Sequence, residues 1–378
     1  MSLHFIDGEG LLLDREHHRL YALNASATLI WCMLEDGAPP AEICRLLNEQ
    51  YAVSANEAAS YVSGILDQCA SLSRAEKAPA APQDMPIQAG PGHRLRSRHA
   101  EVIATYALLG SVIRVRYDNA RLHDAVHPLL QHGALARATP TIVIDIVPHG
   151  DGVAIIADDL MIGWSWTLED AAVAVRACLT QVATAKSGGL CVVHAGALSR
   201  NGGALLLPGD AGYGKSTLSA GLAARGFDML CDDTTLLAGD PPLVRCLPTG
   251  LCIKRGAYAV LEPLHPHLAG LREWRRPDGK HARYLMPGRD LGWAPVDAAV
   301  AARWMVFPRY HPDQGTSLLP LRRHAALARL LPGVCFLSGH LDPGNLDRLI
   351  AWIERIDCYD LPLSSLDDAT TLIDGLCR

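Results

Sequence analysis

The stretch Gly209-Asp210-Ala211-Gly212-Tyr213-Gly214-Lys215-Ser216 decides how the largest part of this chain folds. Its pattern, G-x-x-x-x-G-K-[ST], is that of a loop whose backbone amides cradle phosphates, with the lysine reaching the terminal phosphates and the serine hydroxyl on Mg²⁺. A buried strand should precede the loop at Ala204–Leu207, and a helix should follow over Thr217–Arg225. This context predicts an α/β domain with a nucleotide site. Its candidate residues are Gly209, Asp210, Ala211, Gly212, Tyr213, Gly214, Lys215, Ser216 and Thr217.

Two acidic residues and one histidine flank the loop in the sequence. The apolar run Phe227–Cys231 ends in Asp232-Asp233. At the carboxyl end of a strand beside such a loop, one carboxylate can hold Mg²⁺ while the other accepts a proton from an attacking hydroxyl. An ordinary surface turn is the alternative interpretation of this pair. His194 ends the apolar run Leu190–Val193, one strand ahead of the loop, so we expect it close to the phosphates, although a lone histidine there is usually structural.

Length and composition limit the class of protein. The chain has 378 residues, of which 49% are hydrophobic and 20% charged, so we expect two or three folded domains. With 34 Lys and Arg against 40 Asp and Glu, the net charge of −6 has the wrong sign for a nucleic-acid partner. The 11 cysteines contain no C-x-x-C pair, which favours reduced thiols in a cytoplasmic protein. Neither a signal peptide nor a membrane-spanning segment is evident, so we expect no membrane association.

The clearest break in composition lies at Ser71–His99, where prolines fall among Ala, Gln and Gly. This indicates a semi-extended linker at 75–98. We therefore divide the chain into a small domain at 1–74, the linker, an α+β accessory part at 99–186 and a catalytic domain at 187–378. In the accessory part, no residue carries recognisable chemistry; strands are predicted at Ser111–Tyr117 and Thr141–Val147, and a helix at Leu168–Ala185.

The first 74 residues have the pattern of a small α+β winged-helix unit. Gly10–Asp14 and Arg19–Leu23 predict a hairpin joined by a polar turn. Helices should follow at Ala25–Glu35 and Pro40–Gln50. Ser54-Ala-Asn-Glu57 is a capping box that opens a third helix.

This unit resembles the PqqD family, the peptide-recognition modules of systems that modify ribosomally made peptides. The resemblance rests on the hairpin, on Ala27-Thr-Leu-Ile-Trp31, and on the spacing of Ile43, Tyr51 and Val53. It implies that the leader of a precursor peptide adds as a strand at the hairpin edge and lies against the third helix. An oligomerisation or nucleic-acid module of the same shape is the alternative.

The region from 190 to 335 resembles HPr kinases. The resemblance is carried by His194-Ala195-Gly196, the glycine-rich loop and Cys231-Asp232-Asp233, with weaker similarity at Trp304–Tyr310 and Leu318–Leu330. It implies ATP and Mg²⁺ as cofactors and a homo-oligomer. By the same resemblance, Lys215 grips phosphate, Ser216 and Asp233 hold Mg²⁺, Asp232 is the general base and His194 is a supporting group.

One segment departs from that family. Thr249–Gly256 carries Lys254 and Arg255 where a metal-binding glutamate is expected, which leaves the second metal ligand and any phosphorolysis open. We predict that Lys254 or Arg255 contacts phosphate oxygens as charge moves to the leaving group, with a solvated loop as the alternative. The polar segment Arg272–Lys280 either covers the nucleotide or is a surface loop.

Together these patterns predict a multidomain chain in which a winged-helix peptide reader precedes an α/β kinase domain of HPr kinase type. The predicted reaction is ATP-dependent phosphorylation of a hydroxyl, a serine in the first instance, on a ribosomally made precursor peptide. Two alternatives stay open: a nucleotide-responsive peptide carrier without phosphoryl transfer, and a kinase of a small hydroxylated metabolite.

Overall fold

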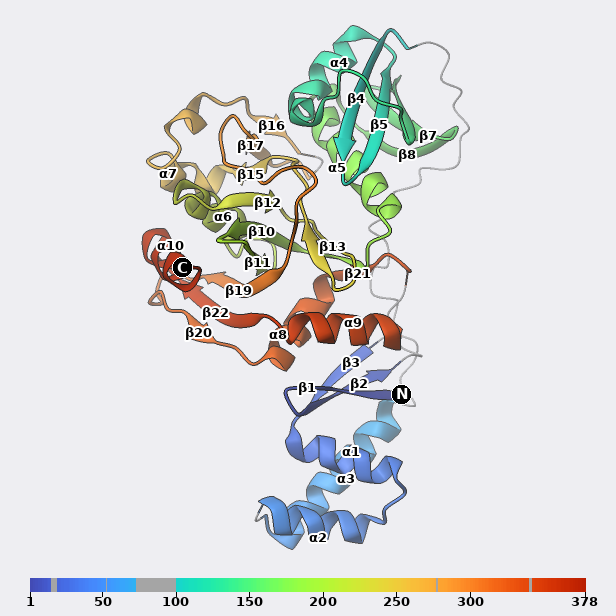
Figure 1. The fold of residues 1–378 in the computed structure, drawn as a ribbon, viewed down its shortest axis with the longest axis vertical. Coiled ribbons are helices and arrows are strands. Elements are labelled where there is room, and N and C mark those ends of the chain that lie inside the picture. The colour runs from blue at the N-terminus through green and yellow to red at the C-terminus, as the bar shows by residue number, and fades with distance from the viewer. Residues whose placement is uncertain (15–18, 52, 73–99, 277, 340–341) are drawn as a thin grey trace. The chain divides into compact units, whose positions relative to one another are not determined.

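The computed structural model describes residues 1–14, 19–51, 53–72, 100–276, 278–339 and 342–378, which form two compact units (Figure 1). The first unit contains the described residues of 1–83, 322–331 and 340–354, and the second contains the others. The predicted linker at 75–98 and the polar turn at 15–18 lie outside the described residues.

The first unit begins with a three-stranded antiparallel sheet in the order β1 (Ser2–Ile6), β2 (Glu9–Asp14), β3 (Arg19–Leu23). The pairing of β2 with β3 confirms the predicted hairpin, with Gly10 opposite Leu23. Strand β1 was not predicted; it joins β2 through a turn in which Asp7 and Gly8 both adopt positive φ.

Three helices follow the sheet and confirm the sequence expectation: α1 (Ala25–Glu35), α2 (Pro40–Tyr51) and α3 (Ala55–Leu72). The capping box forms as expected, because the Ser54 amide donates to the Glu57 carboxylate at 2.9 Å and the Glu57 amide donates to the Ser54 hydroxyl at 3.3 Å. The apolar faces of these three helices meet in a core of Ile30, Ile43, Leu47, Ala58 and Val62.

Two helices from late in the chain complete this unit. Helix α8 (Arg323–Leu330) packs on β3, and α9 (Pro343–Ile353) packs on β1. Charged pairs fix both contacts: Arg322 with Glu9 at 2.9 Å, Arg323 with Asp7 at 3.2 Å, His324 with Glu9, and His4 with Asp347 at 2.6 Å. The predicted boundaries assigned both helices to the catalytic domain, whereas here they pack with the N-terminal sheet.

The second unit opens with a five-stranded sheet in the order β4 (Val102–Leu108), β5 (Ser111–Tyr117), β6 (Ile142–His149), β7 (Gly152–Ala157), β8 (Leu160–Ser165). Helix α5 (Leu168–Lys186) covers one face of it and contacts α4 (Ala120–Val126) (Figure 1). The strands and the helix expected in this region are confirmed.

The body of the second unit is built on a six-stranded sheet in the order β12-β10-β11-β19-β22-β20. Its strands are β10 (Ala195–Arg200), β11 (Gly203–Pro208), β12 (Asp228–Cys231), β19 (Ala302–Tyr310), β20 (Leu319–Pro320) and β22 (Asp357–Leu363). Strands β11, β19 and β22 run parallel. Helix α6 (Lys215–Ala224) follows β11, so the strand, loop and helix around the glycine-rich stretch are as expected.

Two smaller sheets flank this body. One has the order β18 (Ala299–Val300), β14 (Leu243–Arg245), β13 (Thr235–Ala238), β9 (Cys191–Val193), β21 (Val334–Phe336). The other has the order β15 (Leu251–Lys254), β17 (His281–Leu285), β16 (Trp274–Arg275), and the short helix α7 (Tyr258–Leu261) lies between β15 and β16 in the chain.

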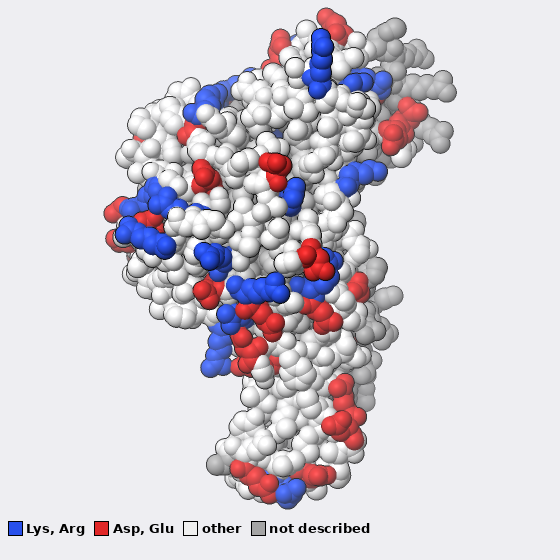
Figure 2. All heavy atoms as spheres, in the orientation of Figure 1, with Lys and Arg blue, Asp and Glu red and all other residues white. Residues whose placement is uncertain are grey.

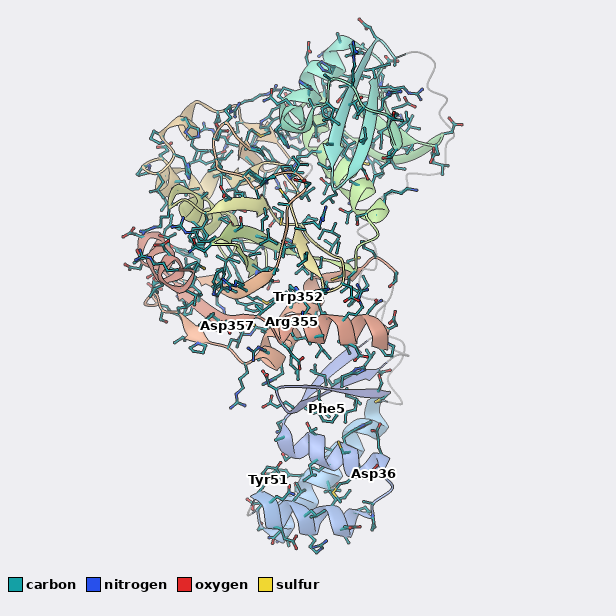
Figure 3. The ribbon with its side chains drawn as sticks, in the orientation of Figure 1. Phe5, Asp36, Tyr51, Trp352, Arg355 and Asp357 are labelled. Atoms are coloured by element: carbon teal, nitrogen blue, oxygen red, sulfur yellow. The ribbon has the colours of Figure 1, made fainter. Side chains whose placement is uncertain are left out.

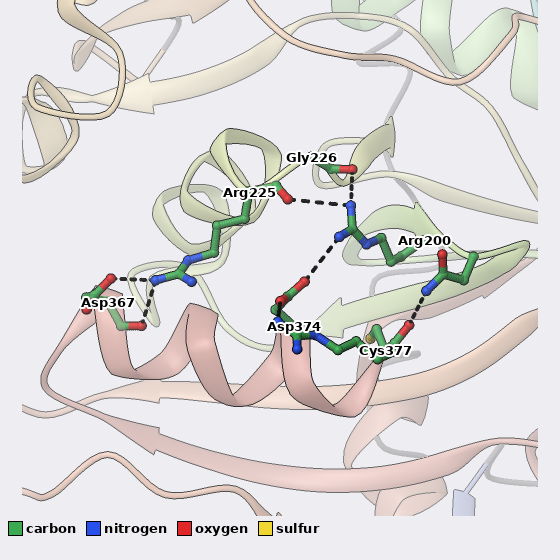
Figure 4. Close-up of polar contacts among 8 residues, drawn as sticks. Arg200, Arg225, Gly226, Asp367, Asp374 and Cys377 are labelled. Atoms are coloured by element: carbon green, nitrogen blue, oxygen red, sulfur yellow. Dashed lines mark hydrogen bonds and ion pairs between the residues drawn. The ribbon is translucent and has the colours of Figure 1, made fainter.

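The last helix, α10 (Leu366–Leu376), supports α6 from behind. A Cβ atom placed on Gly221 of α6 would lie only 3.0 Å from side-chain carbons of Leu366 and Thr370, so the two helices approach closely. Figure 4 shows the polar contacts around α10, where Arg225 pairs with Asp367 and Arg200 with Asp374. Helix α6 is therefore held at the end away from the glycine-rich loop.

On the face shown in Figure 2, Lys and Arg side chains lie among Asp and Glu side chains. No described helix combines the length and the apolar character that a membrane span requires. The cysteines whose side chains the structure describes are free thiols.

We predict that Glu9→Ala destabilises the first unit by about 1–3 kcal/mol, because it leaves the largely buried His324 without the carboxylate that it shares with the exposed Arg322. Glu49→Ala is the matched control, since it breaks an exposed pair with Arg45 and should cost less than about 0.5 kcal/mol. Thermal unfolding of the full chain measures both. Equal losses for the two variants would show that α8 is not anchored through Glu9.

Candidate functional site

The glycine-rich loop adopts a backbone that ordinary residues rarely reach. Gly209, Gly212 and Gly214 have φ values of +148°, +97° and +90°. These conformations are open to glycine because it lacks a Cβ atom. The loop leads into the N-terminus of α6, where unpaired amides and the helix dipole favour an anion.

Lys215 is buried at the centre of the site, with its residue 5% exposed. Its Nζ donates to the carbonyl oxygens of Gly209 at 2.5 Å and Asp210 at 3.2 Å, and it lies 3.9 Å from the Asp233 carboxylate. Burial lowers the pKa of Lys215, while the charge of Asp233 acts in the opposite direction. Carbonyl oxygens of the glycine-rich loop thus hold the ammonium group of Lys215 in place.

His194 links the lysine to the acidic turn. Its Nδ1 lies 3.0 Å from the carbonyl oxygen of Asp233, and its Nε2 lies 3.3 Å from Lys215 Nζ. Since a carbonyl only accepts, Nδ1 carries the proton, and Nε2 is left to accept from the lysine. His194 therefore lies beside Lys215 at the end of the glycine-rich loop, and its predicted closeness to phosphates stays a prediction.

The two carboxylates of the acidic turn have different surroundings. Asp232 is buried; it accepts from the Ser216 hydroxyl at 3.2 Å and from the Cys252 amide at 2.8 Å. Burial, then the neighbouring Asp233 charge, raise the pKa of Asp232 to about 7. The Asp233 side chain is 41% exposed, and its backbone has a φ of +58°, a strained value for a residue with a Cβ atom. The Asp232 carboxylate therefore lies at the floor of the site, and the Asp233 carboxylate faces its opening.

A cavity of about 540 Å³ lies above these groups. Lys254 and Arg276 line it, and Arg276 also donates to the Cys252 sulfur at 3.2 Å. Arg255 does not line the cavity, and its guanidinium pairs with Glu273. The other lining residues are His194, Asp210, Ala211, Gly212, Gly214, Lys215, Ser216, Thr217, Leu218, Asp233, Cys252, Ile253, Gly256, Ala257, Val260, Tyr310, Leu363, Ser364 and Leu366. The predicted residues Gly209, Tyr213 and Asp232 adjoin the cavity without lining it.

The accessory part also reaches this site. Arg176 of α5 donates to the carbonyl oxygen of Thr249 at 2.8 Å, and its guanidinium lies 4.8 Å from the centre of the Tyr284 ring. Its positive charge acts to lower the pKa of Asp232. Sequence reasoning missed Arg176 and Tyr310, because neither belongs to a local motif and both reach the site only through the fold.

Oxygen donors at the site suit a magnesium ion. The Ser216 hydroxyl and the Asp232 carboxylate meet at 3.2 Å, and Asp233 is next in the chain. Mg²⁺ usually takes one or two protein carboxylates and fills its shell with phosphate oxygens and water. Within the described ranges, no cluster of three His, Cys, Asp or Glu side chains is arranged to hold a metal by itself. Two aspartates and a hydroxyl are compatible with an ion that arrives with a nucleotide.

The first unit has a cavity of its own, of about 650 Å³. Its walls come from β2, β3, α1, α2 and α3, and Tyr51, at the end of α2, is labelled in Figure 3. Tyr21 and Trp31 also line it, and neither the Tyr21 hydroxyl nor Trp31 Nε1 has a hydrogen-bond partner among the described residues. The remaining walls are largely apolar, with Leu12, Leu23, Ala27, Ile30, Leu47, Val53, Tyr61, Gly64 and Ile65, and their polar members are Asn24, Ser26 and Ser60.

Residues 9–72 match the family described as Coenzyme PQQ synthesis protein D (PqqD). The chain therefore carries a PqqD-like domain. This confirms the resemblance seen in the sequence for this part of the chain, and it covers β2, β3 and the three helices that surround the cavity. No curated protein matches the chain.

We predict that Asp232→Asn stabilises the chain at neutral pH in the absence of nucleotide and Mg²⁺, by at least about 1 kcal/mol. A carboxyl whose folded-state pKa is raised contributes less stability as pH rises from its unfolded value, about 4, through its folded value of about 7. The stability difference between variant and wild type should therefore grow between pH 5 and 8. The exposed Asp313→Asn change is the control, and thermal melts across that pH range test it. A difference that does not vary with pH would show that Asp232 ionises normally.

Proposed function

We propose that this chain is an ATP-dependent kinase that transfers a phosphoryl group to a hydroxyl, in the simplest case a serine, of a ribosomally made precursor peptide. The observation that carries the proposal is the constellation around one cavity: a glycine-rich loop, a buried lysine and two carboxylates with different exposure. These are the parts that phosphoryl transfer needs, because its catalysis consists of positioning and charge stabilisation.

The PqqD-like domain supports a peptide as the acceptor. Strand β3 is the edge strand of its sheet, so an extended peptide can add beside it through main-chain hydrogen bonds. The neighbouring cavity is large enough for one or two bulky apolar side chains of that peptide. Binding the peptide in this unit raises the local concentration of its acceptor segment at a weak catalytic site.

In the proposed reaction, Asp233 accepts the proton of the acceptor hydroxyl. The hydroxyl oxygen forms a bond to the γ-phosphorus of ATP, the bond from that phosphorus to the bridging oxygen breaks, and ADP leaves with the electron pair. We assign the base to Asp233 because its side chain lines the cavity, whereas Asp232 is buried behind Ser216. Sequence reasoning had given the two carboxylates the opposite roles, and the exposure difference favours this reversed assignment.

Ser216 and Asp232 are the residues that would hold Mg²⁺ in this assignment, and the ion would neutralise phosphate charge. Lys215 provides positive charge at the loop. Lys254 lines the cavity and is placed to contact phosphate oxygens, whereas Arg255 is engaged by Glu273. Of the two basic residues in this segment, we therefore retain Lys254 for that role.

Separate substitutions of the two aspartates test the proposal. Asp233→Asn should lower kcat by about 10²–10⁴-fold while leaving the Kd for ATP within about threefold, because only proton transfer is lost. Asp232→Asn should instead weaken Mg²⁺-dependent nucleotide binding. The measurement is intact-mass analysis and kinetics with ATP, Mg²⁺ and candidate precursor peptides that carry a leader segment and a serine. Peptide phosphorylation that survives Asp233→Asn would reject Asp233 as the base, and nucleotide binding without any phosphorylation would favour a carrier.

Filling the peptide cavity should separate peptide capture from chemistry. A Cβ atom on Gly64 meets nothing within 4 Å, so Gly64→Phe can fold while its ring occupies the cavity. We predict at least about a tenfold rise in KM for a full-length peptide, with little change in turnover of a leaderless acceptor peptide. Ser63→Phe, on an exposed neighbour that does not line the cavity, is the matched control. Equal KM values for both variants would place peptide binding elsewhere.

A further inference from the structure

The candidate cavity has the acidic turn on one side of the glycine-rich loop and Tyr310, Leu363 and Leu366 on the other, and Ile253, Ala257 and Val260 add further apolar lining. Strands β11, β19 and β22 run parallel, so their carboxyl ends lie at one edge of the sheet. Strand β11 leads into the glycine-rich loop, β19 ends at Tyr310, and β22 ends at Leu363, which is paired with Tyr310. The acidic turn follows β12, which lies beyond β10 on the other side of β11. The loop therefore separates the two aspartates from the Tyr310 side.

The position of the reactive end orients a bound nucleotide. Its terminal phosphate must lie near Lys215 and Asp233, where the proposed transfer occurs. The Tyr310 side of the loop lies away from the acidic turn and can receive the nucleoside end. We propose that Tyr310, Leu363 and Leu366 form the subsite for the purine base of the nucleoside triphosphate, with the Tyr310 ring as its stacking surface. This inference rests on the proposed function and adds a base-binding site to it.

Exposure and packing of these side chains carry the assignment. Tyr310 is 54% exposed although it lines the cavity, and its Cβ atom lies 3.8 Å from the place where a Cβ on Gly214 would be. Leu363 is 5% exposed and forms an apolar floor beside it. A base covering the ring would remove apolar surface from water, and stacking on an aromatic ring contributes about 1–3 kcal/mol.

The hydrogen bonds of this wall predict how selective the subsite is. The amides of Ser364 and Ser365 both donate to the Thr316 hydroxyl at 3.1 Å, and the carbonyl oxygen of Leu363 accepts from the His311 amide at 2.9 Å. The side-chain polar groups on this part of the lining are the hydroxyls of Ser364 and Tyr310. Because these three main-chain groups are already engaged, we expect stacking to hold the base more than hydrogen bonds do, and discrimination between adenine and guanine should be weak.

Calorimetric titration of the full chain with Mg²⁺ and ATP, GTP or inorganic tripolyphosphate tests the subsite. Tyr310→Ala should weaken ATP and GTP binding by about tenfold and leave tripolyphosphate unchanged, while Tyr310→Phe should retain nucleotide affinity. Wild-type affinities for ATP and GTP should agree within about tenfold. Trp166→Ala, which removes another exposed ring outside the cavity, is the control and should leave the affinities for all three ligands unchanged. Lys215→Ala should weaken the binding of all three ligands.

Several results would overturn the inference. If Tyr310→Ala lowers the affinities for ATP and for tripolyphosphate by the same factor, the ring supports the loop and does not bind the base. Unchanged ATP binding would place the base elsewhere, and a preference of more than about a hundredfold for one purine would show hydrogen-bond readout. If the nucleotides bind as predicted but no peptide is phosphorylated, the subsite stands and the proposed kinase activity fails. If the wild type binds none of the three ligands, both fail.

Discussion

The buried carboxylate of Asp232 is the group on which the arrangement of the candidate site depends. It accepts from Ser216 at the start of α6 and from the amide of Cys252 in β15, and it follows directly from β12. A single side chain thus joins a helix and strands of two sheets. Burying a carboxylate beside a second one is costly unless hydrogen bonds or cations offset the charge. Arg176 and Lys215 supply part of that positive charge, and Arg176 brings the accessory helix α5 into the same network.

Much of the fold follows from local patterns. The hairpin at Gly10–Leu23, the capping box at Ser54 and the loop that begins at Gly209 were predictable, because turn residues, helix caps and glycine conformations act within a few residues of each other. Strand β1 was missed, since Ser2–Ile6 is short and carries the polar His4. The packing of α8 and α9 on the N-terminal sheet was missed as well, because it depends on pairs such as Glu9 with Arg322, which are far apart in the sequence.

The candidate site was also predictable only in part. Motif residues such as Lys215 and His194 could be found from spacing, and the structure brings them within 3.3 Å. The surroundings of these residues could not be predicted from spacing. Which of Asp232 and Asp233 is buried depends on the fold around them, and Tyr310 reaches the cavity only because β19 lies beside β11. Residue type and spacing indicate the kind of chemistry, whereas burial assigns the roles.

The two units are interleaved along the chain, and this affects how the function can be tested. Deleting residues 1–75 would remove the sheet on which α8 and α9 pack, so loss of activity would follow from exposed apolar surface as readily as from lost peptide binding. Single substitutions keep both units intact. The central claim is that the γ-phosphoryl group moves from ATP to a peptide hydroxyl, and ATP carrying heavy oxygen in the non-bridging positions of its γ-phosphate tests this most directly. Mass spectrometry should find the label in the phosphate ester of the peptide, and it should disappear with Lys215→Ala. Nucleotide binding with no labelled peptide would contradict the account.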